Sequence, residues 1–279
     1  GDERVRCSKL VIAWGAECIH ALLHVDGQDR VCSVNDLLGY AEFRKAVAGK
    51  KKVLIIGAGL IGSEYANDLA AGGFAIEAVD PLSGPIATLL PPKASAAVQH
   101  ALERECGVHY HFGTVVEAID KKGDGIVATL ANGQKVEADI ALSAIGMRPR
   151  IGLARQSGIA VNRGITVNRH LETSAPDVYA FGDCAEVEGH VLYYVLPLMA
   201  CARALAKTLH GDRTAVVYGP MPVGVKVTVC PIQVSPPARG ATGEWHEEVV
   251  EGDSVRALFQ DPEGKLLGFA LTGKCAEEK

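Results

Sequence analysis

The segment VLIIGAGLIGSEYANDLAAGGFAIEAVD, residues 53–80, constrains the fold more than any other part of the chain. An apolar run precedes Gly57, and the glycines Gly57, Gly59 and Gly62 follow the order G-x-G-x-x-G. We expect a helix from about Gly62 to Ala71 and then a second apolar strand. This order of strand, glycine turn, helix and strand predicts a βαβ unit with a parallel sheet that binds a dinucleotide.

The glycines and one carboxylate have distinct expected roles. Gly57 allows the tight bend, Gly59 lets backbone N–H groups approach a pyrophosphate, and Gly62 lets the helix pack closely on the strand. The helix N-terminus stabilises the phosphate charge. Asp80 ends the second strand roughly 20 residues after the first glycine, where a carboxylate binds the adenosine ribose and repels a 2′-phosphate. The pattern favours NAD(H) over NADP(H), with an ordinary glycine-rich turn as the alternative.

Charge and hydropathy exclude several classes of partner. The net charge of -5 argues against general attraction to nucleic acid or anionic lipid. No apolar stretch reaches the roughly 18 residues of a membrane helix, so no membrane insertion is expected. The first residues, GDERVRCSKL, lack the apolar core of a secretory signal, and a cytoplasmic location is expected. The 8 scattered cysteines contain no C-x-x-C, which favours reduced thiols and argues against a disulfide-reductase centre.

Four stretches together resemble the two-nucleotide flavoprotein reductases, the FAD-dependent pyridine nucleotide oxidoreductases, and within them the branch that reduces rubredoxin. They are GAGLIGSEYANDLAAGG, TSAPDVYAFGDCAE, YYVLPLMACARALAKTL and VKVTVCP. The T-S-x-P-D-V-Y-A-x-G-D pattern is far more specific than the glycine turn. The resemblance extends over essentially the whole chain.

The resemblance implies a flavin site. Asp183, beside Gly182, is expected to hold the ribityl and pyrophosphate region of FAD. The helix starting near Pro197 is expected to face the flavin, with a backbone contact from Val195. Its dipole would stabilise negative charge on the reduced ring. Lys226 is expected beside the ring system, with a solvated lysine as the alternative.

Three further positions follow from the resemblance. Glu64 complements the helix dipole on sequence alone, but the family's Glu after the glycine turn lies at the junction of flavin and nicotinamide. Gly15 and Gly146 mark the places where the chain crosses between the FAD and NAD domains. Trp14 stands where the family commonly has Thr.

The predicted fold class is α/β, with two Rossmann-like domains and a small β-rich C-terminal domain. In this scheme the NAD domain interrupts the FAD domain, whose first part is truncated. The family carries a second glycine turn for FAD, which we expect upstream of Gly1, and the chain as written is expected to bind FAD poorly. The expected segments are residues 1–48 and 147–217 for the FAD domain, 49–146 for the NAD domain and 218–279 for the C-terminal domain.

The implied function is transfer of electrons from NADH through FAD to rubredoxin or a similar small iron-containing carrier. Direct hydride transfer needs no general acid or base, so no catalytic residue is assigned with certainty. Lys226 and Glu64 are the residues expected near the flavin. A ferredoxin-type reductase on the same fold, and a non-enzymatic NAD-binding fragment or sensor, are the alternatives.

Two histidines raise the question of a metal site. His109 and His111 alternate on one strand face in VHYHF. The sequence shows no nearby Cys or carboxylate to complete a ligand set, so packing or surface histidines are favoured and no metal site is predicted. A basic cluster at the domain crossings either attracts an acidic carrier or is a solvated hinge. It contains Lys50, Lys51, Lys52, Arg148 and Arg150.

Overall fold

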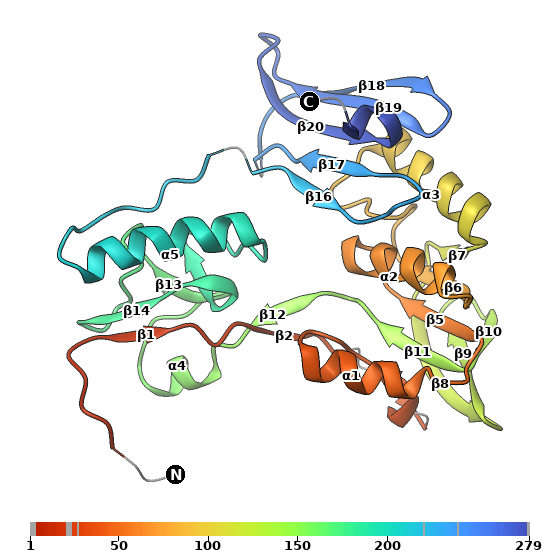
Figure 1. The fold of residues 1–279 in the computed structure, drawn as a ribbon, viewed down its shortest axis with the longest axis horizontal. Coiled ribbons are helices and arrows are strands. Elements are labelled where there is room, and N and C mark those ends of the chain that lie inside the picture. The colour runs from red at the N-terminus through yellow and green to blue at the C-terminus, as the bar shows by residue number, and fades with distance from the viewer. Residues whose placement is uncertain (1–3, 21–23, 27, 220, 239, 278–279) are drawn as a thin grey trace. The chain divides into compact units, whose positions relative to one another are not determined.

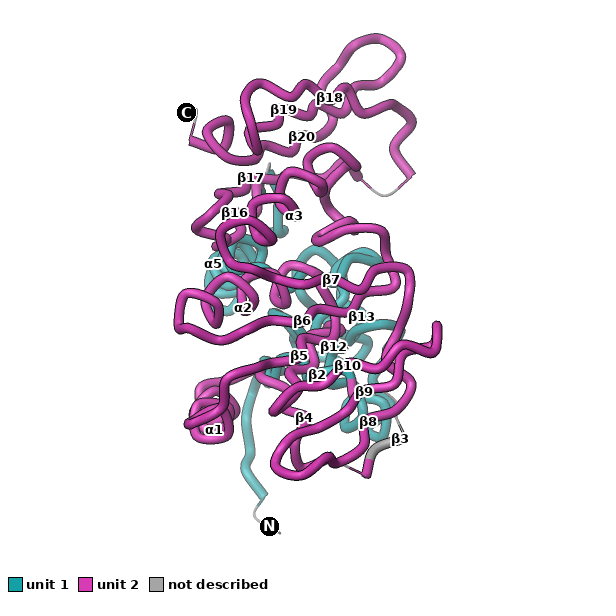
Figure 2. The backbone as a smooth tube through the Cα atoms, turned by 90° about the vertical axis from the view of Figure 1, so that its right-hand side faces the viewer, with its two compact units in different colours: residues 1–19, 147–221 teal, residues 20–146, 222–279 magenta. Residues whose placement is uncertain are grey.

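The computed structural model describes residues 4–20, 24–26, 28–219, 221–238 and 240–277. The chain forms two compact units (Figures 1 and 2). Unit 1 contains residues 1–19 and 147–221, and unit 2 contains residues 20–146 and 222–279. The expected NAD and C-terminal segments therefore share unit 2, which also takes in residues 20–48.

A parallel sheet of five strands forms the centre of unit 2. In spatial order its strands are β4 (Val31–Cys32), β11 (Ile140–Ser143), β5 (Lys52–Ile56), β6 (Ala75–Asp80) and β7 (His109–Phe112). Strands β5 and β11 are almost continuously buried, as expected for a sheet covered on both faces. The carboxyl ends of all five strands lie at one edge, where ligands bind in open α/β sheets.

Three helices accompany the parallel sheet: α1 (Leu37–Ala46), α2 (Leu60–Ala71) and α3 (Pro92–Cys106). The side chain of Asp36 caps α1 by accepting a hydrogen bond from the Gly39 N–H at 2.7 Å. Helix α2 begins at Leu60, slightly before the Gly62 start expected from the sequence. Buried residues of α2 and α3 pack with Ile55 and Ile76 in the largest apolar core.

A second sheet covers the other face of the parallel sheet. It consists of the antiparallel strands β8 (Val116–Lys122), β9 (Gly125–Leu130) and β10 (Lys135–Ala138), with β3 (His24–Val25) parallel to β8. These are the hairpins that KKGDG and ANG predict. Ile119, Ile126 and Leu130 of this sheet pack against Leu54 and Val79 in a separate apolar core.

The C-terminal part of unit 2 is an antiparallel five-stranded sheet. Its strands are β16 (Val223–Val225), β17 (Ile232–Ser235), β18 (Glu244–Glu251), β19 (Ser254–Gln260) and β20 (Leu266–Thr272), with η3 (Gly273–Glu277) after them. Glu247 caps α3, accepting backbone N–H bonds from Lys93 at 2.7 Å and Ala94 at 3.1 Å. Arg104 and Asp253 form an ion pair between the same two parts.

The described residues of unit 1 form three strand pairs and two helices. The pairs are β1 (Leu10–Ile12) with β14 (Val178–Ala180), β13 (Ile165–Val167) with β15 (Ala185–Val187), and β2 (Ala16–Cys18) with β12 (Met147–Pro149). The helices are α4 (Gly152–Gln156) and α5 (Val195–Leu209), and the short 3-10 turns of the chain include η1 (Gln28–Arg30) in unit 2 and η2 (Gly182–Cys184) in unit 1. Cys201, Ala204 and Leu205 of α5 pack on the buried strands.

The observed architecture agrees with the predicted α/β fold and its β-rich C-terminal domain. Helix α5 begins at Val195, earlier than the expected start at Pro197, because proline is tolerated anywhere in a helix's first turn. Across the described parts of the chain, every helix is too short or too polar to span a bilayer.

Candidate functional site

The glycine turn lies between β5 and α2, at the carboxyl edge of the parallel sheet. Gly57 has φ +98°, which favours glycine, and a Cβ there would lie 2.7 Å from the Ala144 carbonyl oxygen. A Cβ on Gly62 would lie 1.9 Å from the Gly57 oxygen, so α2 approaches the strand at backbone contact. A Cβ on Gly59 meets nothing within 4 Å, which leaves room for a phosphate beside its backbone. These three environments suit the roles expected from the sequence.

Asp80 is tied to the glycine turn. Its Oδ2 accepts a hydrogen bond from the Ala58 N–H at 2.7 Å, and its Oδ1 accepts one from the Leu82 N–H at 2.8 Å. The residue is only 8% exposed. A carboxylate has about four acceptor positions, so two stay available for ribose hydroxyls. Besides its expected role as a ligand, Asp80 therefore orders the turn. This second role has no signal in the sequence.

Two buried hydroxyls lie near the same edge. Ser143 ends β11 and Thr114 follows β7, and within the described residues neither hydroxyl oxygen has a hydrogen-bond partner. Unsatisfied buried hydroxyls cost free energy, so a polar ligand or water that reaches them is stabilised. Gly146, the predicted crossing residue, follows shortly after Ser143 and ends this segment of unit 2. The polar residue closing the apolar run IALS is the sequence signal that could have identified Ser143.

Glu64 and Asn67, one turn apart on α2, bind the chain that links β16 to β17. Glu64 Oε1 accepts a hydrogen bond from the Lys226 backbone N–H at 2.8 Å. Asn67 Oδ1 accepts one from the Thr228 hydroxyl at 3.0 Å and one from the Val229 N–H at 3.4 Å. The structure thus brings the two predicted residues Glu64 and Lys226 together through the lysine backbone. The place of both beside a flavin stays a prediction.

The Gly182–Asp183 motif forms η2, just after β14 in unit 1. Gly182 has φ +77°, again a value that favours glycine. Burial raises the pKa of the Asp183 carboxyl. No group among the described residues donates a hydrogen bond to this carboxylate, so it is partly desolvated without compensation. A ligand with hydroxyl groups would supply the missing donors.

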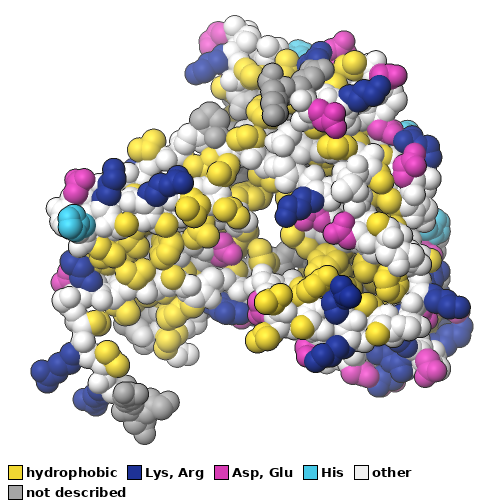
Figure 3. Space-filling view, in the orientation of Figure 1, with side chains coloured by type: hydrophobic (Ala, Val, Ile, Leu, Met, Phe, Trp, Pro, Cys, Tyr) yellow, Lys and Arg dark blue, Asp and Glu magenta, His cyan; other side chains and the backbone are white. Residues whose placement is uncertain are grey.

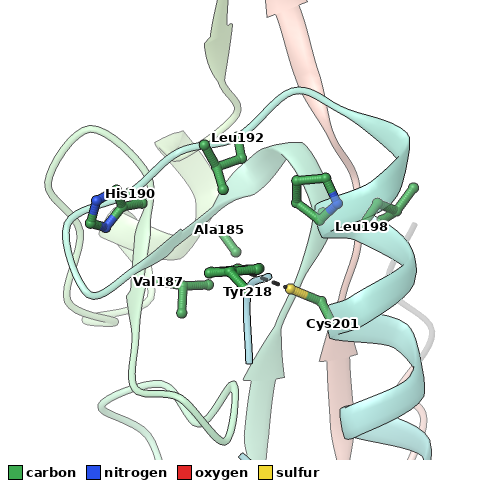
Figure 4. Close-up of a pocket in the computed structure, with 9 residues that line it drawn as sticks. Ala185, Val187, His190, Leu192, Leu198, Cys201 and Tyr218 are labelled. Atoms are coloured by element: carbon green, nitrogen blue, oxygen red, sulfur yellow. Dashed lines mark hydrogen bonds between the residues drawn. The ribbon is translucent and has the colours of Figure 1, made fainter. Parts of the chain in front are cut away.

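A pocket of unit 1 lies beside this motif (Figure 4). Gly182 lines it together with Pro197 and Leu198 from the first turns of α5. Cys201 and Tyr218 also line it, and the Cys201 sulfur lies 3.3 Å from the Tyr218 hydroxyl. Burial raises the pKa of the Cys201 thiol, which therefore stays protonated near neutral pH.

The predicted contact residue Val195 is the first residue of α5. Its side chain is 71% exposed, and Leu196 and Met199 on the same turns are exposed as well. In Figure 3, hydrophobic side chains gather on the face of unit 1 that α5 helps to form. The start of α5 therefore offers backbone N–H groups framed by apolar side chains, which suits a flat aromatic ligand.

The first domain crossing is fixed by Trp14 and Arg150. The Trp14 indole N–H donates to the Arg150 carbonyl oxygen at 2.6 Å, and the Arg150 guanidinium donates to the Trp14 carbonyl oxygen at 3.2 Å. The Arg150 N–H also donates to the oxygen of the predicted crossing residue Gly15 at 3.1 Å. The tryptophan that replaces the family's usual Thr therefore joins the two crossing segments of unit 1.

The expectation from the sequence that no carboxylate lies near His109 and His111 is wrong. Glu77 on the neighbouring strand β6 lies opposite His109, and its Oε2 is 2.7 Å from His109 Nδ1 and 2.8 Å from His111 Nε2. The sequence did not reveal this cluster because the pairing of β6 with β7 brings together residues that are far apart along the chain.

Comparison with known families places two matches on the chain. Residues 1–225 match the pyridine nucleotide-disulphide oxidoreductase family, and residues 215–279 match a rubredoxin binding C-terminal domain. The second match covers the antiparallel sheet β16–β20.

Individual relatives cover nearly all of the chain. A rubredoxin-NAD(+) reductase from Alcanivorax borkumensis is 51% identical over 279 residues, which are 100% of this chain and 72% of the relative. One from Acinetobacter baylyi is 45% identical over 281 residues, covering 99% of this chain and 71% of the relative. Among solved structures, a ferredoxin reductase from Rhodopseudomonas palustris is similar with a TM-score of 0.86 at 25% identity, covering 95% of this chain and 66% of that one.

Proposed function

Because the chain belongs to the pyridine nucleotide-disulphide oxidoreductase family, we propose that it transfers electrons from NADH through FAD to rubredoxin. The observation that carries the proposal is the match of residues 215–279 to a rubredoxin-binding domain, joined to a chain 51% identical to a rubredoxin-NAD(+) reductase. The prediction from the sequence motifs agrees with both. Rubredoxin is therefore the favoured carrier, ahead of the ferredoxin alternative.

NADH fits the carboxyl edge of the parallel sheet. The open space at Gly59 would take the pyrophosphate, and the N-terminus of α2 would stabilise its charge. The free acceptor positions of Asp80 would bind the adenosine ribose and disfavour the 2′-phosphate of NADPH. Ser143 and Thr114 offer unsatisfied hydroxyls to the same ligand.

FAD fits the turn at Gly182 and the start of α5. Asp183 would accept hydrogen bonds from ribityl hydroxyls, which offsets the desolvation that raises the pKa of its carboxyl. The N-terminal N–H groups of α5, starting at Val195, would stabilise negative charge on a bound ring. When bound, the flavin accepts two electrons as a hydride and releases them one at a time. The residues of this chain bind and orient the two nucleotides.

The C-terminal sheet would supply the carrier-binding surface. Its position is fixed by α2 and α3 through Glu64, Asn67 and the cap from Glu247. Binding of the carrier to this sheet would therefore occur on a part of the protein that hydrogen bonds connect to the helices of the NADH-binding sheet.

Stopped-flow mixing tests the proposal. Protein supplied with excess FAD, because the chain is expected to bind FAD poorly, is reduced with NADH and mixed with oxidised rubredoxin or, as the matched carrier, with an oxidised ferredoxin. We expect rubredoxin to be reduced at least about tenfold faster, because residues 215–279 match a rubredoxin-binding domain. Faster reduction of ferredoxin would instead indicate that the chain is a ferredoxin-type reductase. NADH binding without reduction of either carrier, with FAD added, would indicate a non-enzymatic NAD-binding module.

A further inference from the structure

Three potential metal ligands converge on the outer part of the parallel sheet. Glu77, His109 and His111 each offer one ligand atom, and these three atoms lie within 4.8 Å of one another. The side chains of Glu77 and His111 are only 13% and 11% exposed, whereas His109 is 69% exposed. Two ligands are thus held in fixed positions and the third is free to adjust from the solvent side.

The sheet register explains this convergence. Glu77 pairs with His109 between β6 and β7, so both side chains point to the same face. His111 lies two residues further along β7 and shares that face. Ile76 and Ala78, on either side of Glu77, pack in the core formed with the helices, so Glu77 points to the opposite face of the sheet. The glycine turn is not involved in this cluster.

We infer that Glu77, His109 and His111 form a binding site for a divalent transition-metal ion, with Zn²⁺ as the best match. Imidazole nitrogen and carboxylate oxygen are ligands that Zn²⁺ takes in three-residue sites, with water in the fourth position. The exposed side of His109 leaves room for that water. Hard cations such as Mg²⁺ are disfavoured because two of the three ligands are nitrogen.

Metal binding requires a proton shift in each imidazole and a small movement of the three side chains. Without metal, the facing nitrogens of His109 and His111 donate hydrogen bonds to Glu77 at 2.7 and 2.8 Å. Each imidazole must then move its proton to the other ring nitrogen, so that the facing nitrogen carries a lone pair. In a tetrahedral site with bonds of about 2.0–2.1 Å, the ligand atoms lie about 3.3 Å apart, so each side chain shifts by roughly half an ångström.

Lys52 sets the affinity of the site. Its ammonium group forms an ion pair with the other oxygen of Glu77, Oε1, at 2.7 Å. This bond holds the carboxylate in position, as outer partners of metal ligands commonly do. The positive charge of Lys52 also repels a cation at Oε2. A glutamine at residue 52 keeps a donor for Oε1 but removes the charge, and metal binding should tighten about tenfold.

Metal binding would fasten the edge strand β7 to β6. Among the described strands, β7 pairs with β6 alone, so a metal bridge adds a connection at the edge of the sheet. Because a ligand that binds only the folded state stabilises it, the metal should raise the melting temperature. No electron or group transfer is assigned to the ion.

The test uses Zn²⁺ alone, titrated by calorimetry into the full chain in a competing chelator of known affinity. Wild type should bind one Zn²⁺ that is lost in H109Q and in E77Q, while K52Q binds it about tenfold more tightly. The matched control is H100Q, which removes an exposed histidine of the same unit outside the cluster. It should bind like wild type, and Zn²⁺ should raise the melting temperature of wild type, K52Q and H100Q but not that of H109Q or E77Q.

A second readout separates these ligands from the thiols, which also bind Zn²⁺. In ¹⁵N-histidine spectra, Zn²⁺ should shift Nδ1 of His109 and Nε2 of His111 and move the protons to the opposite nitrogens. The exposed position of His109 makes H109Q the variant least able to disturb folding. Equal Zn²⁺ binding by wild type, H109Q and E77Q, or unchanged histidine spectra, would overturn the inference.

Discussion

Two aspartates lie near the carboxyl ends of parallel strands, Asp80 at the end of β6 and Asp183 in the turn after β14, but the two carboxylates differ. Asp80 accepts two backbone hydrogen bonds, at 2.7 and 2.8 Å, and orders the glycine turn. Asp183 receives none from the described residues, and burial raises the pKa of its carboxyl. The first turn is internally satisfied without a ligand, whereas the second gains its hydrogen bonds only when a ligand supplies them.

This difference separates structural from binding contributions. Changes at Gly62 or Asp80, which pack or hold the glycine turn, should cost stability and NADH binding together, because the same groups serve both. A change at Asp183 should weaken flavin binding and increase the stability of the flavin-free protein. Four experiments test the comparison, in order of decreasing expected effect.

The largest effect is expected for Gly62→Ala. The new Cβ would lie 1.9 Å from the Gly57 oxygen, so α2 must move away from β5. We expect a loss of about 3 kcal/mol or more in the free energy of unfolding, with loss of NADH binding. Urea unfolding and NADH titration measure the two. The matched control Gly59→Ala meets nothing within 4 Å, so it should keep its stability and weaken NADH only. Equal destabilisation by both changes would contradict the packing role.

Asp80→Asn should have the next largest effect. The amide has one acceptor oxygen, so it satisfies either the Ala58 or the Leu82 N–H and directs an N–H group at the other. We expect a loss of about 1 to 2 kcal/mol in unfolding free energy and a smaller preference for NADH over NADPH. Chemical denaturation and initial rates with both nucleotides provide the measurement. An unchanged stability would show that Asp80 does not order the turn.

Asp183→Asn should act in the opposite direction on stability. A neutral amide removes the cost of a partly buried charge, so the flavin-free protein should gain up to about 1 kcal/mol. FAD should bind more weakly, because the amide accepts fewer hydrogen bonds from hydroxyls. Thermal unfolding without FAD and a fluorescence titration with FAD test both parts. If Asp183→Asn destabilised the flavin-free protein, the comparison of the two carboxylates would fail.

The smallest expected effect is on the pH dependence of stability. Two carboxyl groups of unit 1, those of Asp183 and Glu172, should change the stability in opposite directions as the pH rises. Burial raises the pKa of Asp183 above its unfolded value of 3.8, so its contribution to stability falls as the pH rises above about 4. The pair with Arg213 lowers the pKa of Glu172 from 4.5 to about 2, so its contribution is lost as the pH falls through that range.

Urea midpoints of the flavin-free protein across this pH range, compared with Asp183→Asn and Arg213→Gln, measure the two contributions. Arg213→Gln should remove stability mainly above about pH 4.5, and by a small amount because the pair is exposed. Parallel pH profiles for wild type and both variants would argue against either linkage.

The sequence predicted the strands, helices and hairpins that have strong local signals. The glycine turn and the apolar strand ending at Asp80 lie where expected, since each depends on residues that are near neighbours in the chain. The starts of α2 and α5 were displaced by a turn or less, because first-turn residues tolerate several conformations.

By itself, the sequence determined the α/β fold class, the dinucleotide turn and the family, because these are written in local periodicity and short motifs. Only the tertiary structure decided which distant residues contact each other. Asp80 accepts a hydrogen bond from the Ala58 N–H, Glu64 accepts one from the Lys226 backbone, and Glu77 lies within hydrogen-bond distance of His109 and His111. These contacts depend on strand register and on the packing of one domain part against another. Such long-range geometry has no period or motif along the chain, so it appears only when the elements pack.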